Sequence, residues 1–219
     1  AIRTLESKKL PIIVGGTGLY INGLVMGINA VPDIDPEIKK EAQNLMESSS
    51  KEEFHRMLSD LDSAAASHIK AGDKQRMIRA YEVFRGTGKS ILYFNSLPTK
   101  SPLDDYNISV FMLSPDRELL YKNCNDRFLK LLEIGALDEV RSNLEKQSPA
   151  LGFMELKSYL NSEVTLDEAI NLAQTKTRRY AKRQVTWFTH QLQNKKTLSF
   201  SSIDQYYNIL ENITKWVDL

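Results

Sequence analysis

Only two short stretches of this chain are patterned like β-strands, and this scarcity constrains the fold more than any other feature. Residues 11–14 (Pro-Ile-Ile-Val) and 108–113 (Ile-Ser-Val-Phe-Met-Leu) are apolar runs rich in β-branched residues. Glycines and the apolar stretch 19–26 follow the first run, which is typical of a strand, a tight turn and a helix. Two strands are few for a stable sheet. The sequence therefore predicts an α/β chain, mostly helical by residue count, whose sheet is incomplete within these residues.

Helical patterns fill most of the remaining chain. Asp35-Pro36-Glu37 places a capping residue, a proline and an acid in the order in which helices begin. Thr165 and Glu168 form a capping box that opens a long helix. The stretch 86–90 (Gly-Thr-Gly-Lys-Ser) resembles the end of a Walker A loop only superficially, because its first glycine ends a helix and no strand precedes it. The expected helices cover residues 36–48, 51–60, 63–70, 74–85, 117–134, 137–146, 153–160, 165–193 and 203–217.

Composition narrows the class of protein. The 219 residues are enough to bury a core, and an apolar share of 42% with a charged share of 26% indicates a globular chain. A single cysteine, Cys124, excludes an internal disulfide framework and a multi-cysteine zinc site, and it fits a reducing cytosol. No run of about 18 apolar residues and no signal peptide is present. We therefore expect a cytoplasmic protein with no membrane span. Because the chain begins at Ala1 rather than Met, we also expect its true N-terminus to precede it.

The net charge of +1 hides a segregation of charges along the chain. Residues 31–62 hold nine acids against four bases, whereas residues 70–100 hold seven bases against two acids. Residues 174–193 hold five bases and no acid. A bound phosphate responds to charges within about 8–10 Å, so local clusters matter more to it than the total. The two basic segments are therefore either anion-binding surfaces or solvated helix faces.

The glycine turn at residues 15–18 (Gly-Gly-Thr-Gly) is the first candidate site. Glycines let a backbone approach a ligand closely, and amides at the start of a helix attract phosphate. The Thr17 hydroxyl adds a hydrogen-bond donor and acceptor. A plain tight turn explains the same residues equally well.

Arginines and aromatic residues supply the other candidates. Arg76 and Arg79 lie three residues apart and share a helix face that suits phosphate, or they are simply solvated. Arg127 precedes Phe128 and is a candidate to face inward, where its partner would be a carboxylate or a ligand phosphate. Over residues 176–189, bases alternate with aromatic residues, a pattern that suits phosphates and stacked bases if the aromatic rings are not core. The three histidines show no metal-ligand spacing.

Six stretches, in this order, resemble the tRNA dimethylallyltransferase (tRNA isopentenyltransferase) family of bacteria. They are residues 11–20 (PIIVGGTGLY), 35–37 (DPE), 75–84 (QRMIRAYEVF), 117–121 with 125–127 (RELLY and NDR), 152–156 (GFMEL) and 178–188 (RRYAKRQVTWF). The resemblance covers nearly the whole chain, and its most specific parts are GGTGLY and AKRQ-x-TWF.

This resemblance implies an enzyme that transfers a dimethylallyl group from dimethylallyl diphosphate to N6 of the adenosine 3′-adjacent to the anticodon in tRNA, releasing diphosphate. It implies a P-loop-kinase-like core with a parallel sheet, here residues 1–30 and 71–219, and a helical insertion, residues 31–70, that grips the anticodon stem-loop. The family's nucleotide-binding (ATP-binding) P-loop and the aspartate that acts as base on the adenine amine precede Ala1, so we expect this chain to lack them. The resemblance further implies a Mg²⁺ cofactor with no ligands in this chain, and a monomer.

The resemblance also assigns roles to individual residues. Thr17 contacts the region of the reacting nucleotide, and Arg127 holds the diphosphate of dimethylallyl diphosphate. The residues expected to contact tRNA are Lys39, Gln75, Arg76, Met77, Ile78, Arg79, Gly152, Phe153, Met154, Lys182, Arg183, Gln184 and Trp187. One departure from the family is the short stretch between Lys146 and Gly152, where an expected arginine is lost.

Two other functions stay open at this point. The first is an adenylate isopentenyltransferase that acts on a free nucleotide, and the second is a non-catalytic tRNA-binding module. The helical segment 35–70 argues against the first, because a small substrate needs no anticodon grip.

Overall fold

The computed structural model of the chain describes residues 2–216, and these residues form two compact units. Unit 1 comprises Ala1–Asn22 and Tyr106–Leu219, and unit 2 comprises Gly23–Asp105. The described residues are mostly helical and include one small parallel sheet, in line with the predicted α/β class.

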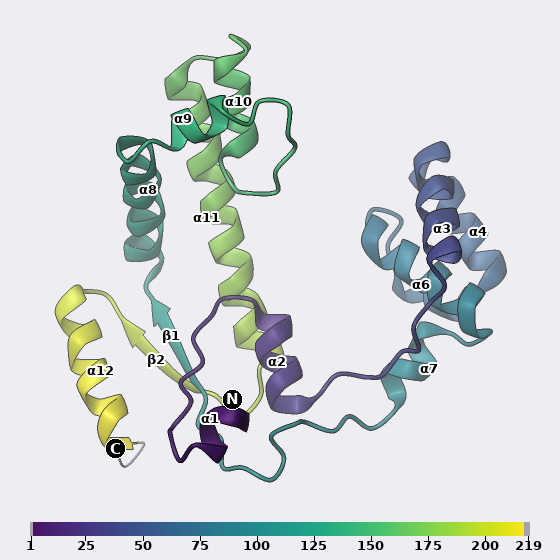
Figure 1. Ribbon diagram of the computed structural model, residues 1–219, viewed down its shortest axis with the longest axis horizontal. Coiled ribbons are helices and arrows are strands. Elements are labelled where there is room, and N and C mark those ends of the chain that lie inside the picture. Colours follow the sequence, from purple (N-terminus) through teal and green to yellow (C-terminus); the bar gives the residue numbers. More distant parts are fainter. Residues whose placement is uncertain (1, 217–219) are drawn as a thin grey trace. The chain divides into compact units, whose positions relative to one another are not determined.

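The sheet of unit 1 consists of two strands from distant parts of the chain. β1 (Phe111–Pro115) pairs in parallel with β2 (Lys196–Phe200). α8 (Arg117–Glu133) leads away from β1 and α11 (Leu166–Gln191) leads back to β2, so the two helices lie side by side (Figure 1). Parallel strands require a crossover of this kind. The prediction of β1 is confirmed with its bounds shifted from 108–113.

β2 was not expected from the sequence. Its residues, Lys-Thr-Leu-Ser-Phe, are mostly polar, and only Leu198 among them is buried. Hydrogen bonds to β1, rather than an apolar pattern, define this strand.

The hydrophobic core of unit 1 lies among its helices. α9 (Ala136–Arg141), α10 (Phe153–Leu160), α8 and α11 each contribute one buried residue: Val140, Leu156, Phe128 and Ala173. The predicted capping box begins α11, where the Thr165 hydroxyl accepts from the Glu168 amide and the Glu168 carboxylate accepts from the Thr165 amide. α12 (Ile203–Trp216) packs against β2.

The strand expected at residues 11–14 is wrong. This segment lies in irregular backbone between α1 (Ile2–Glu6) and α2 (Gly18–Met26), with Ile12 and Val14 exposed by 74% and 90%. A strand exists only where its backbone pairs with a neighbour. None of the described residues, 2–216, pairs with this segment in a sheet.

Unit 2 is a cluster of short helices. They are α3 (Pro36–Ser48), α4 (Lys51–Leu61), α5 (Ser63–His68), α6 (Lys74–Thr87) and α7 (Ile91–Ser96), of which α7 was not expected. Aspartate or serine side chains cap each of them at its start. The stretch 86–90 stops α6, as predicted, but Gly86 lies within the helix and the stop is at Gly88, which takes a left-handed φ of 68°.

The core of unit 2 joins α4 and α6. Phe54, Leu58 and Met77 have no exposed surface there. Residues 71–105, which we expected to belong with the α/β core, pack in this unit because α6 supplies part of its buried face. The helices expected over 31–70 therefore form one portion of a larger helical unit.

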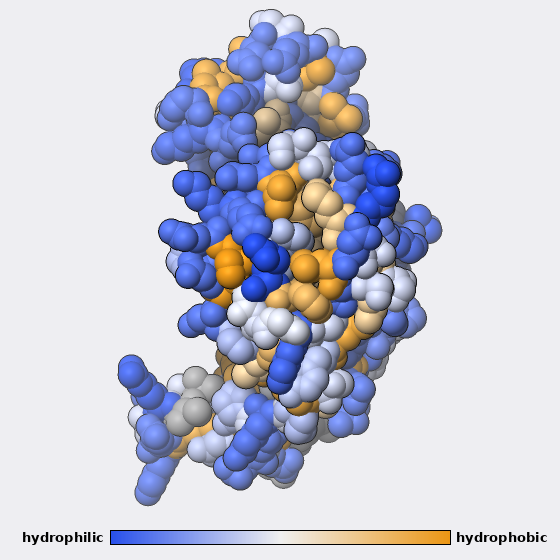
Figure 2. All heavy atoms as spheres, turned by 90° about the vertical axis from the view of Figure 1, so that its right-hand side faces the viewer, coloured by the Kyte–Doolittle hydropathy of each residue, from blue (hydrophilic) through white to orange (hydrophobic). Residues whose placement is uncertain are grey.

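None of the helices within the described residues is long and apolar enough to cross a bilayer. Hydrophilic side chains cover much of the face drawn in Figure 2, with hydrophobic side chains in patches between them.

A polar contact joins α3 to α6 at the edge of the unit 2 core. The Tyr81 hydroxyl donates to Glu41 Oε1 at 2.9 Å, and Arg85 Nη2 lies 3.3 Å from the same oxygen. The hydrogen bond from Tyr81, and then the hydrogen bond and charge of Arg85, lower the pKa of Glu41. Burial raises the pKa of Tyr81, and its bond to Glu41 adds to this.

We expect Tyr81→Phe to lower the free energy of unfolding by about 1 kcal/mol near neutral pH, because one hydrogen bond to a carboxylate is lost. The lowered pKa of Glu41 means that this contribution is present above the carboxyl's unfolded pKa and is lost as the pH falls through the folded one. Urea unfolding at pH 7 and at about pH 3 measures this, and a deficit that stays the same at both pH values contradicts it.

Candidate functional site

The glycine turn of unit 1 packs against the C-terminal half of α11. Gln184 Nε2 donates a hydrogen bond to the Gly16 carbonyl oxygen at 2.9 Å. A Cβ at Gly18 would lie 2.0 Å from Cε3 of Trp187, and one at Gly16 would lie 2.5 Å from Gln184 Nε2. The Trp187 ring is rigid, so packing requires glycine at position 18; at Gly16 the neighbouring atom is the end of a flexible side chain, which would have to give up its bond to the Gly16 carbonyl oxygen to make room.

Thr17 lies between these two glycines and is exposed. Its carbonyl oxygen accepts from the amides of Tyr20 and Ile21 in the first turn of α2. The Thr17 side chain is therefore presented at the start of a helix, where the backbone dipole favours an anion.

A stripe of basic and aromatic residues runs along α11 from this contact. We call Lys176, Tyr180, Arg183 and Trp187 the α11 stripe; steps of three or four residues place them along one side of the helix. The Arg183 guanidinium carbon lies 5.7 Å from the centroid of the Tyr180 ring, a cation–π distance, and Tyr180 is 41% exposed. At about 1.5 Å per residue, the stripe spans roughly 16 Å.

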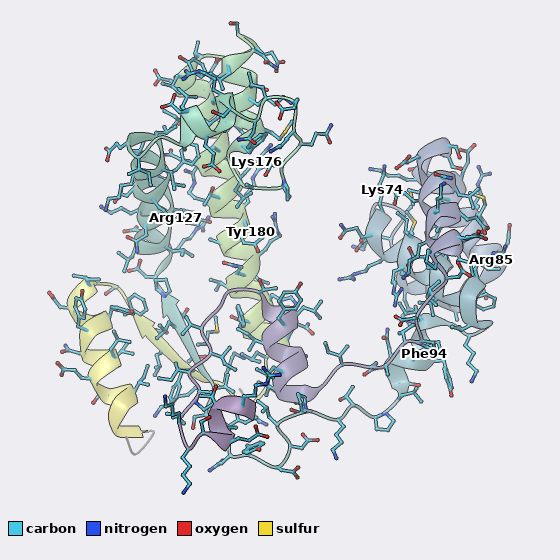
Figure 3. The ribbon with its side chains drawn as sticks, in the orientation of Figure 1. Lys74, Arg85, Phe94, Arg127, Lys176 and Tyr180 are labelled. Atoms are coloured by element: carbon cyan, nitrogen blue, oxygen red, sulfur yellow. The ribbon has the colours of Figure 1, made fainter. Side chains whose placement is uncertain are left out.

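The far end of the stripe meets α10. Lys176 forms an ion pair with Glu155, a carboxylate that is only 6% exposed (Figure 3 labels Lys176). Glu155 follows Gly152, Phe153 and Met154 directly, so this turn lies beside the upper end of the stripe. The α11 stripe therefore runs from the glycine turn at 15–18 to the turn at 152–154.

Gly152 is required for a different reason from the glycines of the turn at 15–18. Its φ is 96°, and a Cβ there would lie 2.5 Å from Cε2 of the buried Phe128. Phe153 is half-buried in the core of unit 1, whereas Met154 is 43% exposed. Of the turn, Met154 is the side chain presented to solvent.

Arg127 is exposed on α8, so the inward orientation considered for it is wrong (Figure 3). Cys124 and Phe128, four residues apart, occupy the buried face of α8, and Arg127 falls to one side of it. Among the described residues, no carboxylate forms an ion pair with Arg127. Burial raises the pKa of the Cys124 thiol, and the charges of Arg127 and Arg178 partly offset this.

Other residues of the predicted site in unit 1 are distributed around α11. Lys182 and Arg183 are exposed, and Gln184 and Trp187 are half-buried against the glycine turn. On the side that faces α8, Arg178 Nη1 donates to Asn125 Oδ1 at 2.7 Å. This hydrogen bond connects α8 to α11.

In unit 2 the predicted site residues do not share one face. Lys39 on α3 and Gln75 and Arg76 on α6 are exposed. Met77, in contrast, has no exposed surface and supports the core, so its side chain presents nothing to a ligand.

Ile78 and Arg79 are half-buried on α6. Arg79 Nη1 lies 3.2 Å from Glu82 Oε2. Ile78 and Arg79 follow Gln75 and Arg76 by three residues, so each pair lies on the same side of α6.

Lys176, Tyr180 and Glu155 were not among the residues assigned to the site, although the first two lie in the candidate stretch 176–189. Tyr180 belongs to the α11 stripe, and its spacing from Lys176 and Arg183 is visible in the sequence. Glu155 is a buried acid that neutralises Lys176, and no sequence signal identifies it.

Within the described residues, no group of three or more His, Cys, Asp or Glu side chains is placed to hold a metal ion. These residues therefore do not fit a Mg²⁺ site built from three or more protein ligands.

Comparison with known proteins decides the family. The sequence model for IPP transferase matches residues 1–191. The chain belongs to the IPP transferase family. A tRNA dimethylallyltransferase of Rickettsia bellii is 43% identical in an alignment of 219 positions. This alignment covers 97% of this chain and 70% of that protein.

Two solved structures resemble the fold of this IPP transferase family member. One is the full-length tRNA isopentenylpyrophosphate transferase of Bacillus halodurans, with 30% identity and a TM-score of 0.56 over 98% of this chain and 68% of that one. The other is a eukaryotic dimethylallyltransferase described as acting on tRNA, with 24% identity and a TM-score of 0.73 over 97% of this chain and 57% of that one. The second likeness concerns the fold alone.

We expect Gly18→Ala to separate the glycine turn from α11, because the new methyl group overlaps the Trp187 ring. The free energy of unfolding should fall by about 1–3 kcal/mol. In a Trp216→Phe background Trp187 is the remaining tryptophan, and its fluorescence should shift to the red as the ring becomes exposed.

Gly72→Ala is the matched control, because a Cβ there meets nothing within 4 Å. It should change stability by no more than about 0.5 kcal/mol and leave the Trp187 emission unchanged. Unchanged emission and stability in Gly18→Ala would show that the packing described here does not constrain position 18.

Proposed function

We propose that this chain is the RNA- and diphosphate-binding portion of a tRNA dimethylallyltransferase. The enzyme transfers a dimethylallyl group from dimethylallyl diphosphate to N6 of the adenosine 3′-adjacent to the anticodon. Membership of the IPP transferase family and the names of its relatives support this function.

The observation that carries the proposal is the contact between the glycine turn and α11. Gly16 and Gln184 lie 168 residues apart in the sequence and belong to the two most specific motifs of the chain. Their contact brings the exposed Thr17 to the lower end of the α11 stripe. A backbone turn that attracts anions therefore lies next to cations and an exposed aromatic ring.

The chemistry requires a place for charge that develops on a leaving group. N6 of the adenine attacks C1 of the allyl group, the C1–O bond breaks, diphosphate departs with the bonding electrons, and N6 gives up a proton to a general base. A preorganised cation stabilises that charge. Arg127 is suited to this task because its guanidinium is always charged, is exposed, and forms no ion pair among the described residues.

The RNA side of the reaction needs a stacking surface and phosphate contacts. The adenine must leave its stack to reach the allyl carbon. Tyr180, with Arg183 beside its ring, offers an exposed aromatic face for a base. Lys182 and Arg183 in unit 1, and Lys39, Gln75 and Arg76 in unit 2, are the exposed polar residues that we assign to tRNA.

We infer that the reaction takes place in the cytoplasm with the protein as a monomer. A requirement for Mg²⁺ is a separate prediction that activity measurements with and without the ion test directly.

Transfer of a radiolabelled dimethylallyl group to tRNA tests the function. The natural protein that carries this chain should label an unmodified tRNA with adenosine 3′ of the anticodon, and should not label one with guanosine at that position. Labelling of AMP in preference to tRNA would indicate the adenylate enzyme. Salt-sensitive tRNA binding without product at any Mg²⁺ concentration would indicate a binding module.

We expect Arg127→Gln to lower kcat/KM for dimethylallyl diphosphate by about 10²–10³-fold, because a cation that stabilises the transition state is removed. The affinity for tRNA should change less than threefold, because the role of Arg127 is with the diphosphate. Steady-state transfer kinetics and tRNA binding by fluorescence anisotropy measure the two effects.

Arg141→Gln is the control for this experiment, since Arg141 is an exposed arginine of the same unit that pairs with Asp138. It should leave both parameters near their original values. An equal loss of diphosphate use and tRNA binding in Arg127→Gln, or no loss of either, would remove Arg127 from the proposed role.

A further inference from the structure

Glu155 is the one carboxylate that is buried among the described residues of unit 1. Its ion-pair partner is Lys176 of α11, whose side chain stays 56% exposed. Glu155 lies in the first turn of α10, directly after the exposed Met154, where the helix dipole favours a negative charge. The pair therefore joins the turn at 152–154 to the end of the α11 stripe.

Burial makes this pair specific in its geometry. Removing a carboxylate from water is costly unless a cation or hydrogen-bond donors replace the water. An apolar pair of similar size is often as stable as a buried ion pair, or more stable. Apolar side chains, however, tolerate sliding of one helix on another, whereas a buried charge has to stay opposite its partner. The pair therefore specifies the register of α10 on α11 more than it stabilises the fold.

The turn at 152–154 is held from two helices. On the side of α8, a Cβ at Gly152 would lie 2.5 Å from Cε2 of Phe128, so the turn packs closely there. On the side of α11, Glu155 pairs with Lys176. Gly152 begins α10 without a side-chain hydrogen bond to cap it. The position of the turn therefore depends on these contacts with neighbouring helices and not on a local cap.

The register matters because exposed side chains lie at both ends of the pair. Met154 precedes Glu155 by one residue and is 43% exposed. Tyr180 follows Lys176 by about one helical turn and is 41% exposed, and Figure 3 labels both residues on α11. A shift of α10 along α11 would change the spacing between Met154 and the Tyr180 ring. An RNA that contacts both sites needs this spacing to be fixed before it binds.

We propose that Glu155 and Lys176 are positioning residues for the transfer reaction: their ion pair fixes the turn at 152–154 relative to Tyr180, in the arrangement in which both contact the RNA. This inference rests on the proposed function, because the RNA is the tRNA substrate. The competing role for Lys176 is direct contact with a phosphate. In that role its pairing with Glu155 would only weaken RNA binding, because the acid offsets the charge that attracts the phosphate.

Glu155→Gln in the natural protein distinguishes the two roles, because they predict changes of opposite sign. The substitution keeps the size of the side chain, removes one negative charge and leaves the charge of Lys176 in place. A phosphate contact at Lys176 predicts tighter tRNA binding. Positioning predicts that the Kd for a fluorescein-labelled anticodon stem-loop rises about tenfold and that kcat/KM for tRNA falls by about 10–10²-fold, while the KM for dimethylallyl diphosphate stays the same. Fluorescence anisotropy and steady-state transfer kinetics measure these values.

Asp138→Asn is the matched control. Asp138 is an exposed acid of the same unit that pairs with Arg141, and its substitution changes the net charge by the same amount. It should leave kcat/KM for tRNA near the original value. Lys176→Arg, which keeps a cation opposite Glu155, should retain most of the activity.

Glu155→Met combined with Lys176→Met separates positioning from stability. Two unbranched apolar side chains of similar size replace the pair, so the urea midpoint of unfolding should stay the same or rise. The kcat/KM for tRNA should nevertheless be as low as in Glu155→Gln, because no charge fixes the register of α10.

Tighter tRNA binding by Glu155→Gln would overturn the inference in favour of a phosphate contact at Lys176. A double methionine variant as active as the original protein would overturn it too, as would equal losses for tRNA and dimethylallyl diphosphate, which indicate a general loss of structure. Lys176→Arg as impaired as Glu155→Gln would also count against it. If the original protein neither binds nor modifies tRNA, the proposed function fails instead, which is a distinguishable outcome.

Discussion

The close approach of the glycine turn to α11 is the constraint on which the candidate site depends. Gly18 has no space for a Cβ, because the Trp187 ring occupies it, and the Gly16 carbonyl oxygen accepts a hydrogen bond from Gln184. Thr17, between these glycines, is exposed and directly precedes α2. The residues that hold this turn in place belong to the helix that carries the α11 stripe.

Electrostatics along α11 follow from which cations are neutralised inside the protein. Lys176 is paired with the buried Glu155, which would be costly to leave alone in the core. Arg178 is fixed by hydrogen bonds to Asn125 and Thr175. Lys182 and Arg183 form no ion pair with any carboxylate of the described residues. Within this one run of bases, Lys176 and Arg178 connect α11 to neighbouring helices, whereas Lys182 and Arg183 are available to an anion.

Local sequence signals predicted the helices well because each has a start that is specified within a few residues. Asp35, Ser50 and Thr165 cap their helices as side-chain chemistry dictates, and Gly88 ends α6. The strands depended on distant partners instead. Residues 11–14 have the pattern of a strand and no pairing, whereas β2 has a weak pattern and pairs with β1 through its backbone. Strand formation is a property of two segments, and a single segment cannot reveal it.

The same limit applies to the site, and residues 75–79 show why. A sequence motif lists residues together, but a helix turns by about 100° at each one, so consecutive residues face different surroundings. Gln75 and Arg76 are exposed, whereas Met77 is buried in the core and Arg79 pairs with Glu82. On α8, the consecutive residues Arg127 and Phe128 differ in the same way: the first is exposed and the second is buried. A motif of this kind combines residues that build the helix packing with residues that are open to solvent, and only the burial of each side chain separates the two groups.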